Sequence, residues 1–304
     1  MKKYALGLGF GCLVALMGAQ AIRPSEPTQS APPSPRVANQ PLIQKGTDEI
    51  VVAAWNINMD PVGERLAYLV DGIVAMNPDI LAVTELTPLS DRKVLEDALA
   101  KRGLKYTSTF AEQRERQNIV LFVREGVQVT NVKPIPGSND GQSDLRMAYS
   151  ARVKVGNFDS LVVAVHNKSK RVRDGREDTS GIRNRQTAAI WKFVKQEMGS
   201  DPDVMIIGDY NMVPGEDDVN FRSLNPEGKL EILSQPSLKN PFTFIFSDGN
   251  TSFIDGFAIN KGNKHYVRDS FYAVRLDQFF RNTKVWFRQN ITDHIPVSAK
   301  FKIR

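Results

Sequence analysis

Short apolar runs alternate with longer amphipathic stretches along most of this chain. Apolar runs of about four to eight residues that end in polar side chains are typical of buried β-strands. Six such runs lie at residues 51–58, 79–86, 160–168, 204–211, 252–259 and 296–303. Shorter strands are expected around Tyr106 and at residues 119–123, 127–133 and 148–155.

Helical spacing appears between these runs. Residues 62–76 carry a stripe made of Leu66, Leu69, Val70, Ile73 and Val74. Three more helices are expected at residues 90–101, 181–198 and 217–224, and the rest of the chain after them is expected to be mostly strand. Helices after the early and middle strands, with hairpins between, predict an α/β fold of two packed sheets flanked by helices.

One strand end combines a carboxylate with an amide. The tetrapeptide Gly208-Asp209-Tyr210-Asn211 directly follows the apolar run 204–207. Residues two apart on an extended segment project to the same side, so Asp209 and Asn211 can address one ligand together. A glycine before them lets backbone or ligand approach closely. Asp and Asn also form ordinary turns after strands, so this motif alone does not decide a function.

Other strand ends carry chemistry of the same kind. In chain order they are Asn56, with Asn58 two residues on, Glu85, His166, the Gly-Asp-Tyr-Asn segment, Asp255 inside an apolar strand, and Asp293-His294 before the last strand. The order, the strand contexts and the residue types resemble the endonuclease/exonuclease/phosphatase superfamily, which includes pancreatic deoxyribonuclease and the abasic-site endonucleases. The resemblance covers about residues 49–304. It implies a four-layer α/β sandwich of two mainly antiparallel sheets, and divalent-metal-dependent hydrolysis of phosphate esters.

The resemblance also implies a metal site. Glu85 matches the family's principal metal ligand and Asn56 the asparagine that helps to hold metal and phosphate. Asp293 matches a metal ligand, or an acid that orients His166. Hard oxygen ligands suit Mg²⁺, with Mn²⁺ or Ca²⁺ as alternatives. A solvated glutamate at a strand end is the alternative interpretation of Glu85.

Five catalytic roles follow from the same resemblance. His166 and His294 match the histidines that flank the scissile phosphate, and Asp255 matches the aspartate that orients the second of them. Asp209 matches the residue that orients or deprotonates the attacking water. Asn211 matches its partner, which donates a hydrogen bond to a phosphate oxygen. Histidine suits proton exchange because its pKa lies near neutrality.

Basic residues near the first histidine bear on the substrate. Arg146 matches a phosphate-contacting arginine of the family, and an exposed arginine before a strand is the alternative. The segment 168–185 is rich in cations, led by Lys168, Lys170 and Arg171. Such a rim could follow several phosphates of a nucleic acid, or be a solvated loop. Nuclease activity is therefore the favoured function.

Three alternatives use the same core. A sphingomyelinase-like lipid phosphodiesterase needs exposed apolar loops, which Phe279-Phe280 and Trp286-Phe287 could supply unless they are buried in strands. An inositol-phosphate or nucleotide phosphatase would also use the basic rim. A non-catalytic binding module is the alternative from another class.

The N-terminus predicts export. Lys2 and Lys3 precede an apolar run, and Ala19-Gln20-Ala21 is a small-x-small cleavage site, so residues 1–21 are expected to be a signal peptide of a secreted or periplasmic protein. Residues 22–48, rich in Pro, Ser and Gln, are expected to be a disordered leader, and residues 49–304 the catalytic domain. Cys12 is the only cysteine, which excludes cysteine nucleophiles and zinc fingers from the domain. We expect a monomer without a membrane span after signal removal.

Overall fold

The computed structural model describes residues 41–111, 117–172, 178–199, 203–233 and 242–304. All of them belong to one compact unit, Pro35–Arg304. The expected signal peptide and most of the expected leader lie outside the described residues. Among the described residues, no helix has the length and apolar character needed to cross a membrane.

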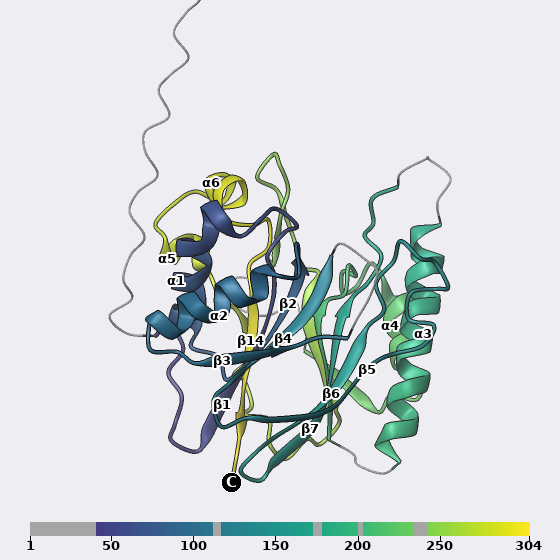
Figure 1. Ribbon diagram of the computed structural model, residues 1–304. Coiled ribbons are helices and arrows are strands. Elements are labelled where there is room, and N and C mark those ends of the chain that lie inside the picture. The colour runs from purple at the N-terminus through teal and green to yellow at the C-terminus, as the bar shows by residue number, and fades with distance from the viewer. Residues whose placement is uncertain (1–40, 112–116, 173–177, 200–202, 234–241) are drawn as a thin grey trace, which may run out of the picture. The chain divides into compact units, whose positions relative to one another are not determined.

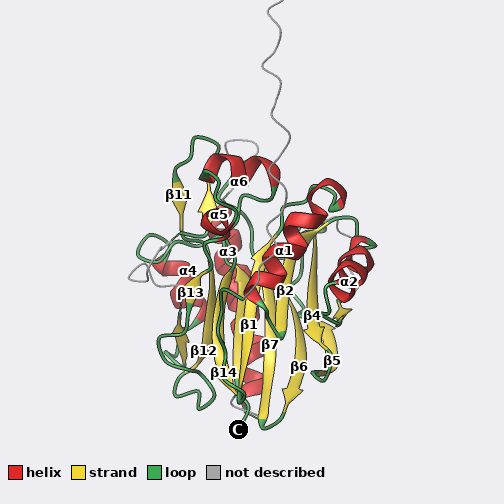
Figure 2. Ribbon diagram, turned by 90° about the vertical axis from the view of Figure 1, so that its left-hand side faces the viewer, coloured by secondary structure: helices red, strands yellow, loops and turns green. Residues whose placement is uncertain are grey.

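Two six-stranded sheets form the centre of the unit (Figures 1 and 2). The first has the order β13-β14-β1-β2-β4-β3, with β1 at Glu49–Asn56, β2 at Ile80–Leu86, β3 at Tyr106–Thr109, β4 at Asn118–Arg124, β13 at Tyr272–Ala273 and β14 at Val297–Lys302. The second has the order β5-β6-β7-β8-β12-β9, with β5 at Gln128–Pro134, β6 at Tyr149–Val155, β7 at Phe158–His166, β8 at Val204–Asp209, β9 at Leu230–Ile232 and β12 at Asp255–Asn260. Only β1–β2 and β7–β8 pair in parallel among these strands.

Helices cover the outer face of each sheet (Figure 1). The 3-10 turn η1 (Gly63–Arg65) and helices α1 (Leu66–Met76), α2 (Asp91–Lys101), α5 (Leu276–Phe279) and α6 (Lys284–Asn290) lie on the side of the first sheet. Helices α3 (Thr179–Met198) and α4 (Asp218–Leu224) lie on the side of the second. A small hairpin of β10 (Phe244–Ile245) and β11 (Thr251–Ser252) completes the unit. The four-layer α/β sandwich with mainly antiparallel sheets is confirmed.

Alternation along β1 shows why its sequence is apolar throughout. Val51, Ala53 and Trp55 pack into the core under the helices, whereas Val52 and Ala54 pack into the core between the sheets. Successive side chains of a strand point to opposite faces, so a strand that is covered on both faces must be apolar at nearly every position. The end of such a strand is therefore the first position where a polar side chain can take part in binding or catalysis.

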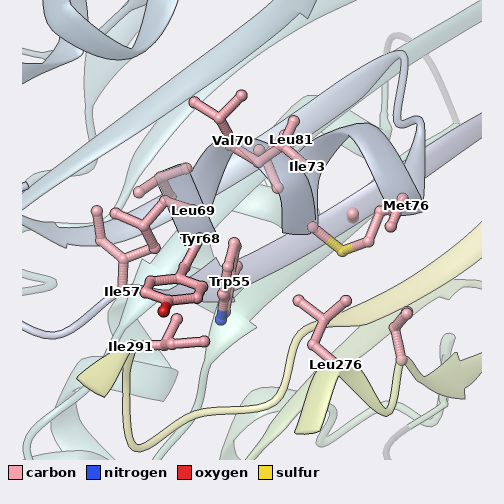
Figure 3. Packing of buried hydrophobic residues seen from close by; sticks show 14 of the residues in the cluster. Trp55, Ile57, Tyr68, Leu69, Val70, Ile73, Met76, Leu81, Leu276 and Ile291 are labelled. Carbon is pink, nitrogen blue, oxygen red and sulfur yellow. The ribbon is translucent and has the colours of Figure 1, made fainter. Parts of the chain in front are cut away.

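The predicted stripe of α1 packs as expected. Leu69 and Ile73 are buried against Trp55, and Leu276 from the far end of the chain joins the same cluster (Figure 3). The helix stops at Asn77, which takes a left-handed conformation with φ of 51° and precedes Pro78. Asparagine tolerates this conformation at a helix end, and the following proline cannot continue the helix.

The folded region begins before the expected boundary at Glu49. Ile43 is 2% exposed and belongs to the core under α1. Lys45 forms an ion pair with Asp79, and the Leu42 amide donates to the Ala75 carbonyl. Ile43 packs into the core of the domain and Lys45 forms an ion pair with the domain's Asp79, so this segment is part of the fold. The polar composition of residues 22–48 does not reveal these contacts.

The sequence analysis expected the aromatic residues near the C-terminus to lie in strands. They lie instead in and beside helices α5 and α6. Phe280 and Phe287 are buried, and Phe279 and Trp286 pack partly buried against the same core. These four side chains therefore do not form an exposed apolar loop.

Candidate active site

Five strands bring their polar ends to one edge of the sandwich. The parallel register of β7 and β8 sets His166 opposite Asp209, and the antiparallel register of β8 and β12 sets Asp255 opposite Asp209. In the first sheet, Asn56 ends β1 and pairs with Thr84, the residue before Glu85. Strand pairing thus assembles residues that are far apart in sequence.

Asn56 joins the two sheets at this edge. Its Nδ2 donates to Glu85 Oε1 at 3.1 Å and to Asp209 Oδ2 at 3.2 Å. Its Oδ1 accepts the backbone N–H of Asn58 at 3.0 Å, where Asn58 lies in the loop after β1. The amide therefore turns its nitrogen toward the carboxylates, which leaves one lone pair of Oδ1 for any ion.

Glu85 stands on a strained piece of backbone. Its φ is 63°, and the pairing of β2 with β4 shifts register between Val83 and Leu86. Residues other than Gly, Asn and Asp rarely take this left-handed backbone conformation, which costs them about 1–2 kcal/mol. The irregular strand end aims the carboxylate toward Asn56 and His166.

His166 is a buried, neutral imidazole. Its Nε2 lies 3.4 Å from Glu85 Oε1 and 3.5 Å from Asp209 Oδ2. Burial, the nearby Arg146 cation and His294 hold its pKa well below the ordinary value. Its Nδ1 has no hydrogen-bond partner within the described part of the chain.

His294, in contrast to His166, is protonated and positively charged. Its Nδ1 lies 2.9 Å from Asp255 Oδ2, and its Nε2 lies 3.9 Å from Asp209 Oδ2. Burial lowers its pKa, but the charges of Asp255, Asp209 and Asp293 outweigh burial and raise the pKa to about 10. Asp255 thus orients His294 and is the largest of the effects that favour its protonated form.

Asp209 sits between the two histidines with a carboxylate that resists ionisation. Burial, Asp255 and Glu85 raise its pKa to about 7 against the lowering effects of His294 and of a hydrogen bond from the Asn211 amide. That amide donates to Asp209 Oδ1 at 2.8 Å. Asp209 Oδ2 therefore faces the other site residues and is the oxygen that can take up a proton near neutral pH.

Asn211 reaches the site by a turn. Strand β8 ends at Asp209, and Asn211 has φ of 51°, so the two residues are not neighbours on one extended segment as the sequence analysis assumed. Asn211 Nδ2 donates to the Asn167 carbonyl at 3.1 Å. The turn keeps Asn211 beside Asp209 but directs its amide nitrogen to the loop after β7.

Asp293 lies at the outer side of the cluster. Its Oδ2 accepts from Arg288 at 2.9 Å, and its Oδ1 lies 4.0 Å from His294 Nε2. The contacts of the described residues show no link from Asp293 to His166. Of its two expected roles, this geometry favours the metal ligand over the acid that orients His166.

A polar pocket of about 110 Å³ opens beside Glu85 and His166. Arg146, Lys168 and Gln117 line it, and Arg146 hydrogen-bonds Gln117 Oε1. Arg146 and Lys168 are 8% and 7% exposed. Two expected substrate-binding cations therefore lie in the pocket next to the site.

The rest of the basic segment is largely engaged. Lys170 forms ion pairs with Glu216 and with Asp217, at 3.2 Å and 2.5 Å. Arg183 and Arg185 pair with Asp217 and Asp140 in the same way. Arg171 is exposed, whereas Arg173 and Arg176 lie outside the described residues. The described cations therefore offer a short rim rather than a long track for phosphates.

The sequence analysis missed Phe244. Its ring centre lies 5.0 Å from that of His294, and a β-bridge joins the two residues. Phe246 of the same hairpin is 44% exposed and packs edge-on against Phe244. The alternation of Phe244 and Phe246 is a weak strand signal, and only tertiary pairing places it beside the histidine.

The donor set fits a divalent cation. Glu85, Asp209, Asp255 and Asp293 are hard oxygen donors. Burial first, and then the charges of Asp255 and Glu85, raise the pKa of Asp209. Asp209, Asp255 and His294 offer ligand atoms within 4.8 Å of one another. The charges of Asp255, Asp209 and Asp293 keep His294 protonated, and a protonated imidazole cannot bind a metal, so the oxygen donors are the groups that would take the ion.

A comparison with family models decides the classification. Residues 53–298 match the endonuclease/exonuclease/phosphatase family. The chain belongs to this family. No curated protein matches the sequence.

Solved structures of this family share the fold. Truncated TDP2 from Caenorhabditis elegans superposes with a TM-score of 0.61 at 17% identity, over 84% of this chain and 98% of that one. The Neisseria 3' phosphatase NExo, bound to a product DNA hairpin, gives 0.61 at 19% identity, over 83% and 99%. The human Nocturnin catalytic domain with bound sulfate gives 0.58 at 17% identity, over 84% and 94%. Identities this low establish the fold and leave the substrate open.

Proposed function

We propose that this family member is a divalent-metal-dependent phosphodiesterase that hydrolyses nucleic-acid phosphodiester bonds by in-line attack of water. The observation that carries the proposal is the contact of Asn56 with both Glu85 and Asp209, which brings the two sheets' carboxylates within reach of His166. Export of the protein is a further proposal, which rests on the sequence of residues 1–21 alone.

Glu85 and Asp293 are the residues that would hold the ion. Bound there, Mg²⁺ or a similar cation would neutralise charge on the phosphate oxygens. Asn56 holds Glu85 by its amide nitrogen, so that the carboxylate keeps one direction when the site is loaded. A bound cation would add to the charge that His294 and Arg288 already offer the carboxylates of the site.

The remaining side chains handle protons. Asp209 Oδ2 takes the proton of the attacking water as the new P–O bond forms, because its raised pKa matches this task at neutral pH. The His294 imidazolium, fixed by Asp255, donates a hydrogen bond from Nε2 to charge that develops on the phosphate as the bond to the leaving oxygen breaks. His166 adds a second, neutral donor.

A nucleic-acid substrate is supported by the pocket and by the relatives. Arg146 and Lys168 offer charge to a phosphate beside the scissile one. One structural neighbour is described as a 3' phosphatase bound to product DNA. The lipid alternative has less support, since Phe279-Phe280 and Trp286-Phe287, the residues that suggested it, pack into or against the core.

A phosphomonoesterase acting on a nucleotide or inositol phosphate is the second candidate. The pocket holds about 110 Å³, and Lys170, Arg183 and Arg185 are engaged by acids. A small pocket, with no long basic track among the described residues, suits a single phosphate group as well as a polymer.

A substrate panel tests the proposal. Purified protein would be assayed with Mg²⁺ and with chelator on single-stranded DNA, duplex DNA, RNA, nucleoside and inositol phosphates, and sphingomyelin. We expect cleavage of nucleic acid that requires the metal and is lost in Glu85→Gln. Turnover of small phosphates alone would establish the second candidate. No turnover on any phosphate ester, with intact folding, would overturn both.

A further inference from the structure

Arg65 is a buried arginine whose partners are all main-chain carbonyls. It is 8% exposed and ends the short turn η1. No ion pair to it exists within the described part of the chain. Its Nη1 donates to the Ile57 carbonyl and, at 2.5 Å, to the Ile291 carbonyl. Its Nη2 donates to the Asp60 carbonyl and, at 3.3 Å, to that of Asn58.

These carbonyls belong to two segments that flank the candidate active site. Ile57, Asn58 and Asp60 form the loop that leaves β1 directly after Asn56. Ile291 follows α6 and precedes Thr292-Asp293-His294. Arg65 therefore ties together two loops from opposite ends of the domain sequence.

The first loop sets the orientation of Asn56. The Asn58 amide donates to Asn56 Oδ1, and this bond turns the Asn56 nitrogen toward Glu85 and Asp209. Arg65 holds the Asn58 carbonyl on the other side of the same residue. A shift of this loop would let the Asn56 amide rotate away from both carboxylates.

The second loop sets the position of His294. The Thr292 hydroxyl donates to the Asn56 carbonyl at 2.9 Å and accepts from the His294 amide at 3.2 Å. Trp55 Nε1 donates to the His294 carbonyl at 2.9 Å. Arg65 donates to the carbonyl of Ile291, the residue immediately before Thr292, and so anchors this loop as well.

We propose that Arg65 is a positioning residue that fixes the Asn56 segment and the Asp293-His294 segment in one mutual geometry. The proposal rests on the proposed function, because it assigns Arg65 to the alignment of that same site. A guanidinium suits the task, since its planar fork presents five N–H donors with fixed directions and stays charged.

The cost of burying Arg65 argues for such a role. Burial lowers its pKa against the raising effects of Asp60, Asp293, Asp91 and Glu85. A buried cation without a carboxylate contact gives up solvation that carbonyls restore only in part, and apolar residues often stabilise such places better. Misplacement of reacting groups by about 1 Å can cost about 100-fold in rate, so alignment explains why a cation stands here.

Two variants and a matched control test the proposal. Arg65→Met removes the donors and keeps the apolar stem, and Arg65→Lys keeps the charge but loses the fork. Arg124→Met is the control, because its guanidinium bonds Asn77 and Tyr106 at the end of β4 that lies away from the site. Hydrogen exchange of the peptides that cover residues 56–62 and 288–295 is measured together with kcat and KM.

We expect Arg65→Met to lower kcat at least about tenfold while KM changes less than about threefold. Exchange should rise in both peptides at once and stay unchanged in β8. Arg65→Lys should recover part of the lost kcat, and Arg124→Met should keep kcat although it is destabilised. If Arg65→Met does not fold, the same readouts on Arg65→Lys decide.

Wild-type exchange in both peptides of the Arg65 variants, or an unchanged kcat, would overturn the proposal. A fall in kcat of the same size in Arg124→Met would also overturn it, because the effect would then follow from lost stability. The exchange measurement needs no substrate. It therefore tests the positioning role of Arg65 even if the wild-type protein hydrolyses no phosphate ester. That outcome would refute only the proposed function.

Discussion

Gly208 lies against the Val165 carbonyl so closely that a β-carbon on Gly208 would stand 2.2 Å from the Val165 oxygen. Its φ of 132° is a conformation that side chains rarely adopt. The glycine of the Gly-Asp-Tyr-Asn segment thus allows close approach of backbone, one of the two options that the sequence left open. This approach brings β7 and β8 together where His166 and Asp209 meet.

Gly208→Ala should therefore destabilise the protein by at least about 2 kcal/mol, from overpacking and backbone strain together. Gly126→Ala is the matched control, because Gly126 also has a positive φ, 94°, but has open space where the β-carbon would stand. Urea unfolding of the two variants measures the difference. Equal losses would show that the Val165 contact does not matter.

Asp255→Asn should lower kcat by about 100-fold, since an amide holds the His294 ring less firmly and does not stabilise its positive charge. KM should change little, because Asp255 is 1% exposed and does not line the pocket. Asp71→Asn is a control at equal burial, 2% exposed, where the carboxylate pairs with Arg102 far from the site. An Asp255→Asn enzyme with wild-type kcat would remove His294 orientation from the mechanism.

Alkaline pH should unfold the protein partly through Tyr106. Burial raises its pKa to about 12, from 10.0, and its hydroxyl donates to the Pro78 carbonyl. Between these values the folded state keeps a proton that the unfolded chain has lost, so stability is fully present below pH 10.0 and falls as pH rises toward 12. The loss amounts to at most about 3 kcal/mol.

Tyr106→Phe isolates this contribution. The variant should be less stable by about 1 kcal/mol at neutral pH, where it lacks the hydrogen bond, but its stability should decline less steeply above pH 10.0. Denaturant midpoints at several pH values measure both effects. Parallel pH curves for variant and wild type would contradict the assignment.

Nucleic-acid cleavage should depend only weakly on salt. With Arg146 and Lys168 as the buried cations of the pocket, one or two phosphates are neutralised, so the logarithm of kcat/KM should fall with a slope of about −1 to −2 against the logarithm of salt. Lys168→Ala should reduce kcat/KM about tenfold. Lys170→Ala should leave it nearly unchanged, because Lys170 is held by Asp217. A steep slope would indicate a long phosphate track.

Much of the site could be predicted because strand ends are local features. Asn56, Glu85 and His166 each close an apolar run. Parallel pairing aligns these ends within each sheet, and the packing of the two sheets then brings them together. Sequence order and residue type sufficed for these positions. The helices that cover the sheets could be predicted from the spacing of their apolar residues. In α1, for example, the predicted apolar residues Leu69 and Ile73 pack against Trp55.

Features that depend on tertiary partners could not be predicted. Lys170 reads as a free cation in sequence, and only the fold reveals Asp217 beside it. Ile43 lies in a polar stretch, and its burial depends on a core built by later residues. Arg65 carries no motif at all, since its partners are carbonyls that every residue possesses.

The strained backbone of Glu85 predicts a conflict between activity and stability. Its φ of 63° suits glycine better than any branched or long side chain. Glu85→Gly and Glu85→Ala both remove the carboxylate and its charge, so both should lose metal-dependent cleavage. Only glycine relieves the strain, and Glu85→Gly should therefore be about 1–2 kcal/mol more stable than Glu85→Ala, less the entropy that glycine adds to the unfolded chain. Chemical denaturation without metal measures the difference. If the alanine variant proves the more stable, the backbone at residue 85 stores no strain, and the geometry of β2 there reflects pairing alone.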